Sequence, residues 1–303
     1  MSTPAYQNSL VDVQKPFDFT KVSGKTVVLT GGSSGLGLCY VRAFVKSGAF
    51  VVNGDIKPPA ESFSSDRVVY VKCDVTKWED QVTVFETARA RSPNGGIDIV
   101  IANAGIYGPD ALDGLTDASP AKPETKLLDV NLVGVIYTSK LAGWHFANQD
   151  QAGDRDRCLI LVTSIMGYID TQGSSVYSAA KHGVRGLMTC LRRKGVVRVN
   201  CLAPWFIATP ILPESFIQST RAQFHRRGLD FAKTDDAVTA VMRLATDTEI
   251  NGRTLGVVPR QLSPSGYLDL DRDDFTPGSP LDTLQVMASS LVYGEFGASS
   301  AST

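Results

Sequence analysis

Short runs of apolar, largely β-branched residues alternate along the chain with longer stretches in which apolar residues recur every three or four positions. The short runs have the length and composition of strands. Most are apolar throughout, as expected of parallel strands that helices cover on both faces. Seven strands are predicted, at Thr26–Thr30, Phe50–Asp55, Val68–Lys72, Ile97–Ala102, Cys158–Ser164, Val197–Leu202 and Thr254–Val258.

The stretches between the predicted strands have the spacing of amphipathic helices. Leu36, Tyr40 and Phe44 share one helical face after the first strand. Similar patterns follow at residues 82–88, 127–136, 178–193 and 235–247. Alternation of strands with helices is typical of βαβ units. We therefore predict an α/β fold with a single Rossmann-type, doubly wound parallel sheet of about seven strands flanked by helices.

The chain is predicted to have three parts. Residues 25–260 hold all the predicted strands and form the Rossmann-fold domain, after an N-terminal extension at 1–24. Within the domain, residues 205–234 carry two prolines and no strand pattern, and we expect an irregular insertion that helps to bind a substrate. Residues 261–303 are rich in Ser, Pro, Gly and Asp. We expect this C-terminal appendage to be ordered only in part.

Charge and composition argue against several classes of protein. Thirty basic and 31 acidic side chains give a formal charge of −1, which offers no electrostatic basis for binding nucleic acid or an anionic membrane. No apolar run approaches the ~20 residues that span a bilayer, and the first residues do not resemble a signal peptide. The five cysteines are scattered without a C-x-x-C pair. A cytoplasmic protein is expected.

A glycine-rich loop directly after the first predicted strand is the first candidate binding site. The run from Thr30 to Gly37 reads TGGSSGLG and opens a predicted helix. Glycines in this context permit a tight turn and let the backbone approach a pyrophosphate at the helix N-terminus. The loop thus predicts a dinucleotide site. Its cofactor-binding residues are Gly31, Ser33, Ser34, Gly35, Leu36 and Gly37.

The end of the second predicted strand indicates which dinucleotide is bound. Asp55 lies a little over twenty residues beyond the first glycine and is followed by Ile56. A carboxylate at this strand end accepts hydrogen bonds from ribose hydroxyls and repels a 2′-phosphate. The only nearby cation is Lys57, and no Arg or Lys occurs in the glycine loop. NAD is therefore favoured over NADP.

A serine, a tyrosine and a lysine form the candidate catalytic group. Ser164 ends a predicted strand, and Tyr177 and Lys181 follow on the next helix. Residues at i and i+4 share one helix face, so both polar ends can reach one site. A Tyr-x-x-x-Lys pair alone is also common on protein surfaces. Its position after the Ser164 strand and downstream of a nucleotide loop favours a catalytic role.

Together these motifs resemble the short-chain dehydrogenase/reductase family, from about Gly24 to about Pro259. Within it the chain is similar to NAD-linked 15-hydroxyprostaglandin dehydrogenase-like members and to fungal secondary-metabolite dehydrogenases. The resemblance rests on Thr30–Gly37, Cys73-Asp74-Val75, Asn103-Ala104-Gly105, Asn131, Ser164, Tyr177, Lys181 and the segment Asn200–Pro204.

The resemblance implies a role for each matching residue. Tyr177 would be the acid/base, its pKa lowered by Lys181 and by the cofactor's positive ring. Lys181 would also bond the nicotinamide ribose, Ser164 would orient the substrate oxygen, and Asn131 would hold a water molecule. The further cofactor-binding residues implied are Asp74, Val75, Asn103, Ala104, Gly105, Pro204, Ile207 and Thr209. Trp205 departs from the family, which usually has Gly there.

Aromatic and aliphatic residues in these segments indicate a bulky, apolar substrate. The resemblance implies that this substrate is a secondary alcohol or its ketone, in secondary metabolism. The proposed substrate pocket consists of Ile106, Met166, Trp205, Phe206 and Phe216, with Tyr107, Tyr168 and Phe224 nearby in the sequence. The three histidines lack metal-ligand spacing, so no metal is expected. By resemblance the protein would be a homodimer or homotetramer.

Two other functions are compatible with the scaffold. One is a non-redox enzyme, such as an epimerase, dehydratase or cyclase, that retains the cofactor. The other is an NAD-binding module without turnover. The complete set of Asn131, Ser164, Tyr177 and Lys181 favours the NAD-dependent oxidoreductase.

Overall fold

A computed structural model describes residues 9–60, 63, 66–114, 117, 119–149, 155–195 and 197–290. The chain divides into two compact units, residues 1–270 and residues 271–303. The first unit contains the whole sheet and every residue of the site described below.

One eight-stranded sheet runs through the first unit in the order β3-β2-β1-β4-β5-β6-β7-β8. Neighbouring strands from β3 to β7 pair in parallel, and β8 pairs antiparallel with β7. The strands are β1 (Thr26–Thr30), β2 (Phe50–Asp55), β3 (Val68–Lys72), β4 (Ile99–Ala102), β5 (Cys158–Val162), β6 (Arg198–Pro204), β7 (Thr254–Val257) and β8 (Tyr267–Asp269).

The strand order reverses beside β1, and this reversal positions the site. From β1 the chain proceeds outward to β2 and β3, then returns so that β4 pairs with the other edge of β1. Connections after β1 and after β4 therefore leave toward opposite directions. They open a crevice beyond the carboxyl ends of the two strands, where α/β sheets bind ligands.

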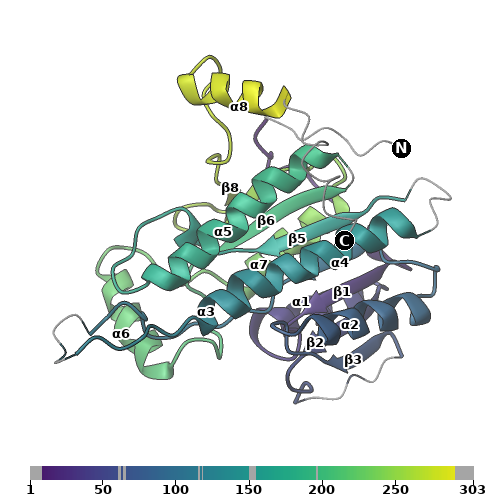
Figure 1. The fold of residues 1–303 in the computed structure, drawn as a ribbon, viewed down its shortest axis with the longest axis horizontal. Coiled ribbons are helices and arrows are strands. Elements are labelled where there is room, and N and C mark those ends of the chain that lie inside the picture. Colours follow the sequence, from purple (N-terminus) through teal and green to yellow (C-terminus); the bar gives the residue numbers. More distant parts are fainter. Residues whose placement is uncertain are drawn as a thin grey trace, which may run out of the picture. The chain divides into compact units, whose positions relative to one another are not determined.

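Helices cover both faces of the sheet (Figure 1). Val27 and Leu29 of β1 point into one core, which they share with α1 and α7, while Val28 points into the other, shared with α2, α4 and α5. A π-helical turn, η2, lies between α3 and α4. The bounds are α1 (Gly35–Lys46), α2 (Trp78–Arg91), α3 (Lys126–Leu128), η2 (Asp129–Val133), α4 (Gly134–Asn148), α5 (Ser175–Leu191) and α7 (Thr234–Thr246).

The predicted α/β fold is confirmed, with differences at two places. The segment 205–234 is not irregular throughout, because α6 (Glu214–His225) occupies its middle and buries Ile217 and Thr220 on one face. β8 lies beyond residue 260, where the predicted domain ended. This strand has only three residues and pairs with β7 across a turn, so its sequence has no strand-length apolar run.

The segment before β1 packs against the rest of the first unit. Val11, Val13 and Phe17 contact the core that contains α7. The buried guanidinium of Arg243 donates hydrogen bonds to the carbonyl oxygens of Asp12 (2.8 Å) and Lys15 (2.7 Å). A short 3-10 helix, η1 (Phe19–Val22), then leads to β1.

The second unit contains α8 (Pro280–Ser290). Four apolar side chains of this helix are 55–64% exposed, namely Leu281, Leu284, Val286 and Met287. Of the C-terminal appendage that was expected to be partly ordered, residues 291–303 lie outside the described residues.

Candidate active site

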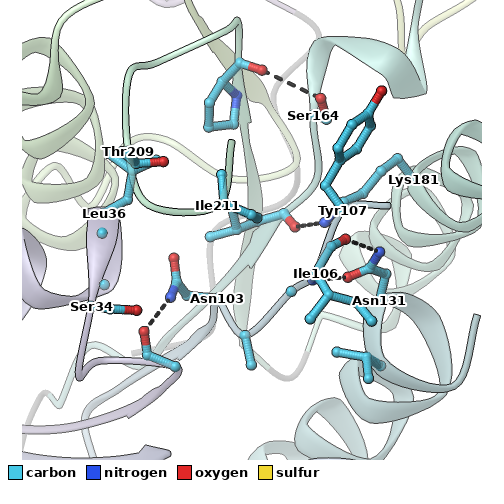
Figure 2. A pocket seen from close by; sticks show the side chains of 18 of the residues that line it. Ser34, Leu36, Asn103, Ile106, Tyr107, Asn131, Ser164, Lys181, Thr209 and Ile211 are labelled. Carbon is cyan, nitrogen blue, oxygen red and sulfur yellow. Dashed lines mark hydrogen bonds between the residues drawn. The ribbon is translucent and has the colours of Figure 1, made fainter. Parts of the chain in front are cut away.

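A cavity of about 630 Å³ lies at the carboxyl ends of the central strands. Its walls come from the loops after β1, β2, β4, β5 and β6 and from one face of α5. Figure 2 shows Ser34 and Leu36 on one side of the cavity and Ser164, Lys181 and Asn131 on the other. The glycine loop and the candidate catalytic group therefore face one space.

The glycine loop has a conformation that side chains would block. Gly31 has φ +72°, and a Cβ there would lie 2.8 Å from Cα of Ala104. A Cβ on Gly37 would lie 2.0 Å from the carbonyl oxygen of Gly31. The side chain of Ser34 makes no capping hydrogen bond within the part of the chain that the structure describes. The first-turn N–H groups of α1 are thus available to an anionic ligand.

Two side chains of β2 form hydrogen bonds with this loop. The buried amide of Asn53 accepts a hydrogen bond from N–H of Gly32 (2.8 Å) and donates one to Oγ of Ser33 (3.0 Å). The carboxylate of Asp55 accepts one from N–H of Ser33 (2.9 Å). Asp55 and Ile56 both line the cavity, and Ile56 is 59% exposed. β2 therefore supports the glycine loop and also places the carboxylate of Asp55 in the cavity wall.

The loop after β4 closes the cavity from the other edge of β1. Asn103 donates from its side-chain amide to the carbonyl oxygens of Thr30 (3.0 Å) and Gly31 (3.1 Å). The N–H groups of Asn103 and Ala104 both donate to Oγ1 of Thr30 (3.1 Å each). These bonds join the ends of β1 and β4 at the point where the strand order reverses.

Ser164, Tyr177 and Lys181 converge on the cavity as predicted from their spacing. Nζ of Lys181 lies 5.6 Å from the ring centroid of Tyr177 and donates to the carbonyl oxygen of Val162 (3.1 Å). Oγ of Ser164 accepts from N–H of Met166 (3.2 Å) and lies within hydrogen-bond distance of the carbonyl oxygen of Pro204 (3.4 Å). The strand end and the helix face thus present three polar groups to one point.

Burial is the largest influence that the protein's own residues have on the pKa of Tyr177. Burial raises the pKa of the Tyr177 phenol to about 12, and the hydrogen bond with Ser164 offsets only part of this effect. Burial also lowers the pKa of the Lys181 ammonium to about 8. Desolvation of the charged form thus raises the pKa of the phenol and lowers that of the ammonium.

Asn131 lies in the π-helical turn η2, and its buried side chain is held in one orientation. Its Oδ1 accepts from N–H of Ile106 (2.9 Å), and its Nδ2 donates to the carbonyl oxygen of Ile106 (2.8 Å) (Figure 2). A Cβ on Gly105 would lie 3.0 Å from Oδ1 of Asn131 and 3.8 Å from Nζ of Lys181. Asn131 thus fixes the loop after β4 beside the lysine.

Aromatic and aliphatic side chains form the rest of the cavity wall. The proposed pocket residues Ile106, Met166, Trp205 and Phe206 line it, and Phe216 does not. Phe216 belongs to a separate apolar cluster, in which the centroid of its ring lies 5.8 Å from the ring centroid of Phe206. Phe216 therefore supports the wall from behind.

The structure brings nearly all the predicted cofactor residues to the cavity. Gly31, Asp74, Val75, Asn103–Gly105, Pro204, Ile207 and Thr209 line it, together with Ser34–Gly37. Ser33 does not line the cavity, because its side chain is buried and its hydroxyl accepts a hydrogen bond from the amide of Asn53. The predicted cofactor and pocket residues did not include the lining residues Gly54, Cys73, Lys126, Val130, Val162, Thr163, Ile165, Pro210, Ile211 and Leu212. Ile211 and Leu212 lie between the two prolines of the insertion, where no periodic pattern marks them.

Comparison with known proteins agrees with this architecture. The family model for short chain dehydrogenases matches residues 25–220. The 5'-hydroxyaverantin dehydrogenase of Dothistroma septosporum is 37% identical over 88% of this chain and 93% of its own length. The NADP-dependent dehydrogenase M3 of a Phoma species is 28% identical over 88% of this chain and 84% of its own.

Among solved structures, the ligand-free aldohexose dehydrogenase of Thermoplasma acidophilum superposes with a TM-score of 0.67 at 25% identity, covering 79% of this chain and 94% of that one. No helix in the described ranges is both long and apolar enough to cross a membrane. The match to the family model covers more than half of the chain and includes the glycine loop and the Tyr177–Lys181 pair. The chain belongs to the short chain dehydrogenase family.

Proposed function

We propose that the protein is an NAD-dependent dehydrogenase that interconverts a bulky, apolar secondary alcohol and its ketone in secondary metabolism. The observation that carries this proposal is the single cavity that Tyr177, Ser164 and Lys181 share with the glycine loop. The name of the relative from Dothistroma septosporum, a dehydrogenase of 5'-hydroxyaverantin, supports the substrate class. Non-redox chemistry has no comparable support.

The residues around the cavity fit a nicotinamide dinucleotide. Gly31 lies close to Ala104, and Gly37 lies close to Gly31. Because these glycines have no side chains, a pyrophosphate could reach the backbone N–H groups at the start of α1. Asp55 and Asp74 would face the adenosine half, and Thr209, Ile207 and Pro204 the nicotinamide half. When bound, the nicotinamide ring accepts or supplies the hydride.

The chain's own residues would handle the proton. Tyr177 exchanges a proton with the substrate oxygen, while the hydroxyl of Ser164 donates to that oxygen and orients it. Because burial raises the pKa of Tyr177 to about 12, phenolate formation near neutral pH requires positive charge in addition to that of Lys181. The oxidised cofactor is cationic at its ring, so alcohol oxidation is the direction in which this charge is present.

The choice of NAD rests on the carboxylate of Asp55. It lies at the carboxyl end of β2 and lines the cavity beside the exposed side chain of Ile56. A 2′-phosphate at the adenosine ribose would approach this carboxylate, and like charges at such a distance repel. Lys57 donates its backbone N–H to Asp55 (3.2 Å) and is the nearest cation in sequence.

The apolar wall supports a bulky, apolar substrate. Tyr107, Trp205 and Phe206 line the cavity, and the rings of Trp205 and Phe206 meet edge-on with centroids 5.1 Å apart.

We further propose a cytoplasmic homodimer or homotetramer. Ile136 and Trp144 of α4 support an oligomer, because both large apolar side chains are more than 40% exposed. Light scattering of the purified protein measures the subunit number.

The experiment that tests the proposed function is a reduced-nicotinamide absorbance assay. A panel of secondary alcohols that includes 5'-hydroxyaverantin is supplied with NAD or NADP. We expect turnover with NAD, and Tyr177→Phe should lower kcat by about 10²–10⁴-fold while NADH still binds. Tyr137→Phe, on α4 and outside the cavity lining, is the matched control. Retained turnover in Tyr177→Phe, or a strong preference for NADP, would contradict the proposal.

A further inference from the structure

The loop after β4 is fastened to the first turn of α5, the helix that carries Tyr177. The side chains that make these contacts are Asp110 and Tyr107, which precede the helix by more than sixty residues. Neither belongs to the Ser164, Tyr177 and Lys181 group, and the proposed proton transfer does not use them. Their contacts therefore need an explanation of their own.

Asp110 caps α5 from a distance. Its carboxylate accepts hydrogen bonds from N–H of Ser175 (2.6 Å) and N–H of Val176 (3.4 Å). The side chain of the residue that precedes the helix, Ser174, makes no capping bond within the described part of the chain. Asp110 is only 8% exposed, and its bonds with the Ser175 hydroxyl and N–H lower its carboxyl pKa below the usual value. A buried anion thus replaces the usual local cap.

Tyr107 forms a second contact beside the cap. Its ring meets the Tyr177 ring edge-on, with centroids 5.2 Å apart and planes at 81°. Its hydroxyl lies 3.2 Å from Oγ of the buried Ser174. Tyr107 also lines the cavity, and Figure 2 shows it next to Ser164 and Lys181. The loop therefore contacts both the backbone before Tyr177 and the Tyr177 ring itself.

We infer that Asp110 is a positioning residue for the proposed reaction. By holding the first turn of α5 against the loop after β4, it fixes the phenol of Tyr177 relative to Ser164 and to the cavity. Without the carboxylate, the N–H groups of Ser175 and Val176, which are partly buried, lose their partner and the first turn frays. A displacement of about 1 Å at a reacting group costs on the order of 10²-fold in rate. This inference rests on the proposed function of Tyr177.

The test compares three variants of the full chain. Asp110→Ala removes both acceptors. Asp110→Asn keeps one oxygen for N–H of Ser175. Asp18→Ala is the matched control, because Asp18 caps η1 through N–H of Thr20 (2.8 Å) and lies outside the cavity lining. For each variant, kcat, the KM values, the Kd for NADH and the melting temperature are measured.

We expect Asp110→Ala to lower kcat about 10–100-fold with the Kd for NADH unchanged within twofold, and Asp110→Asn to restore most of the loss. Asp18→Ala should lower the melting temperature and leave kcat unchanged. A merely structural role predicts a different result, in which stability falls but kcat does not. Unchanged kcat in Asp110→Ala, or an equal loss in Asp110→Asn, would overturn the inference.

A second measurement separates this inference from the proposed function. Amide hydrogen exchange of the peptide that holds Ser175–Ser178 is compared between the unaltered protein and Asp110→Ala. Faster exchange in the variant supports the anchoring role, and unchanged exchange refutes it, whether or not any alcohol is oxidised. If the unaltered protein oxidises no alcohol in the panel, the proposed function fails, while the exchange result still decides whether Asp110 anchors the first turn of α5.

Discussion

Lys181 combines a positive charge with almost complete burial. Its side chain is 4% exposed, it donates to the carbonyl oxygen of Val162, and burial lowers its pKa to about 8. Among the described residues, the carboxylates that line the cavity are Asp55 and Asp74, at the ends of β2 and β3 rather than beside α5. At neutral pH the folded protein therefore carries a poorly solvated buried charge, which is a cost in stability that a catalytic role explains.

This cost predicts a pH dependence of stability. The unfolded lysine titrates near 10.5 and the folded one near 8, so between these values the unfolded state binds more protons and stability rises with pH. Tyr177 acts in the opposite sense, because its phenol titrates near 10 when unfolded and near 12 when folded, so stability falls as the pH rises through about 10. Lys181→Met should remove the rise that Lys181 causes and keep the contribution of Tyr177. Relative to the unaltered protein it should gain at most roughly 3 kcal/mol at pH 7 and progressively less toward pH 9.5.

Urea unfolding of both proteins without cofactor at pH 7, 8.5 and 9.5 measures this difference. Loss of the bond to Val162 adds an offset that does not vary with pH. Parallel pH profiles of the two proteins would show that Lys181 is not the group that titrates.

At the scale of single elements, the backbone of the glycine loop packs so closely that the Cα of Gly37 has room for a hydrogen atom but not for a Cβ. The Cβ that Gly37 lacks would lie 2.0 Å from a backbone oxygen of Gly31, which has no freedom to move because N–H of Gly31 donates to Gly54 (2.7 Å). In contrast, a Cβ on Gly186, on the exposed side of α5, meets nothing within 4 Å. Two helical glycines of one protein thus have opposite roles.

Alanine substitutions should separate these roles. Gly37→Ala displaces the loop and should raise the Kd for NADH at least about tenfold. Gly186→Ala should stabilise the protein by roughly 0.5–1 kcal/mol, because alanine favours the helix, and should leave NADH binding unchanged. Fluorescence titration with NADH and thermal unfolding measure both effects. Normal binding by Gly37→Ala would show that the loop adapts, and the proposed dinucleotide site would lose its main structural support.

Elements with local signals could be predicted from the sequence, and those with distant partners could not. Ser164, Tyr177 and Lys181 lie at a strand end and on one helix face, so spacing alone brings them together. β8 has three residues and depends on pairing with β7. Asp110 and Tyr107 lie on a loop without periodicity, and their contacts with α5 join residues more than sixty positions apart. Such contacts follow from topology, which spacing does not encode.

At the scale of the whole first unit, the N-terminal segment is part of the fold. Arg243 is 1% exposed, donates to backbone oxygens of residues 12, 13 and 15, and lies over the ring of Phe17 at 5.2 Å. Val11 donates its N–H to the carboxylate of Asp269 in β8 (3.0 Å), which also pairs with the buried Arg253 (2.8 Å). The predicted N-terminal extension is therefore attached by buried charges.

Loss of the Arg243 guanidinium should detach this segment. Arg243→Met removes the donors to at least three carbonyl oxygens and leaves Asp247 without its partner at 3.5 Å, so we expect a loss of about 2–4 kcal/mol in the free energy of unfolding. Amide exchange in residues 11–17 should rise with it. Lys15→Ala is the control, since the exposed pair of Lys15 with Glu249 contributes little. A smaller loss in Arg243→Met than in the control would contradict this account.

The bond between Val11 and Asp269 has a consequence for synthesis on the ribosome. The two residues are 258 positions apart, so Val11 is translated long before the carboxylate that accepts its N–H in the folded protein. Closing so long a loop costs conformational entropy. The contacts among β1 to β7 must therefore form first, because they bring the two residues together and offset this cost. Val11 thus reaches its final place only after β8 has been translated. Until then, the edge of β7 that β8 will cover remains open to other chains.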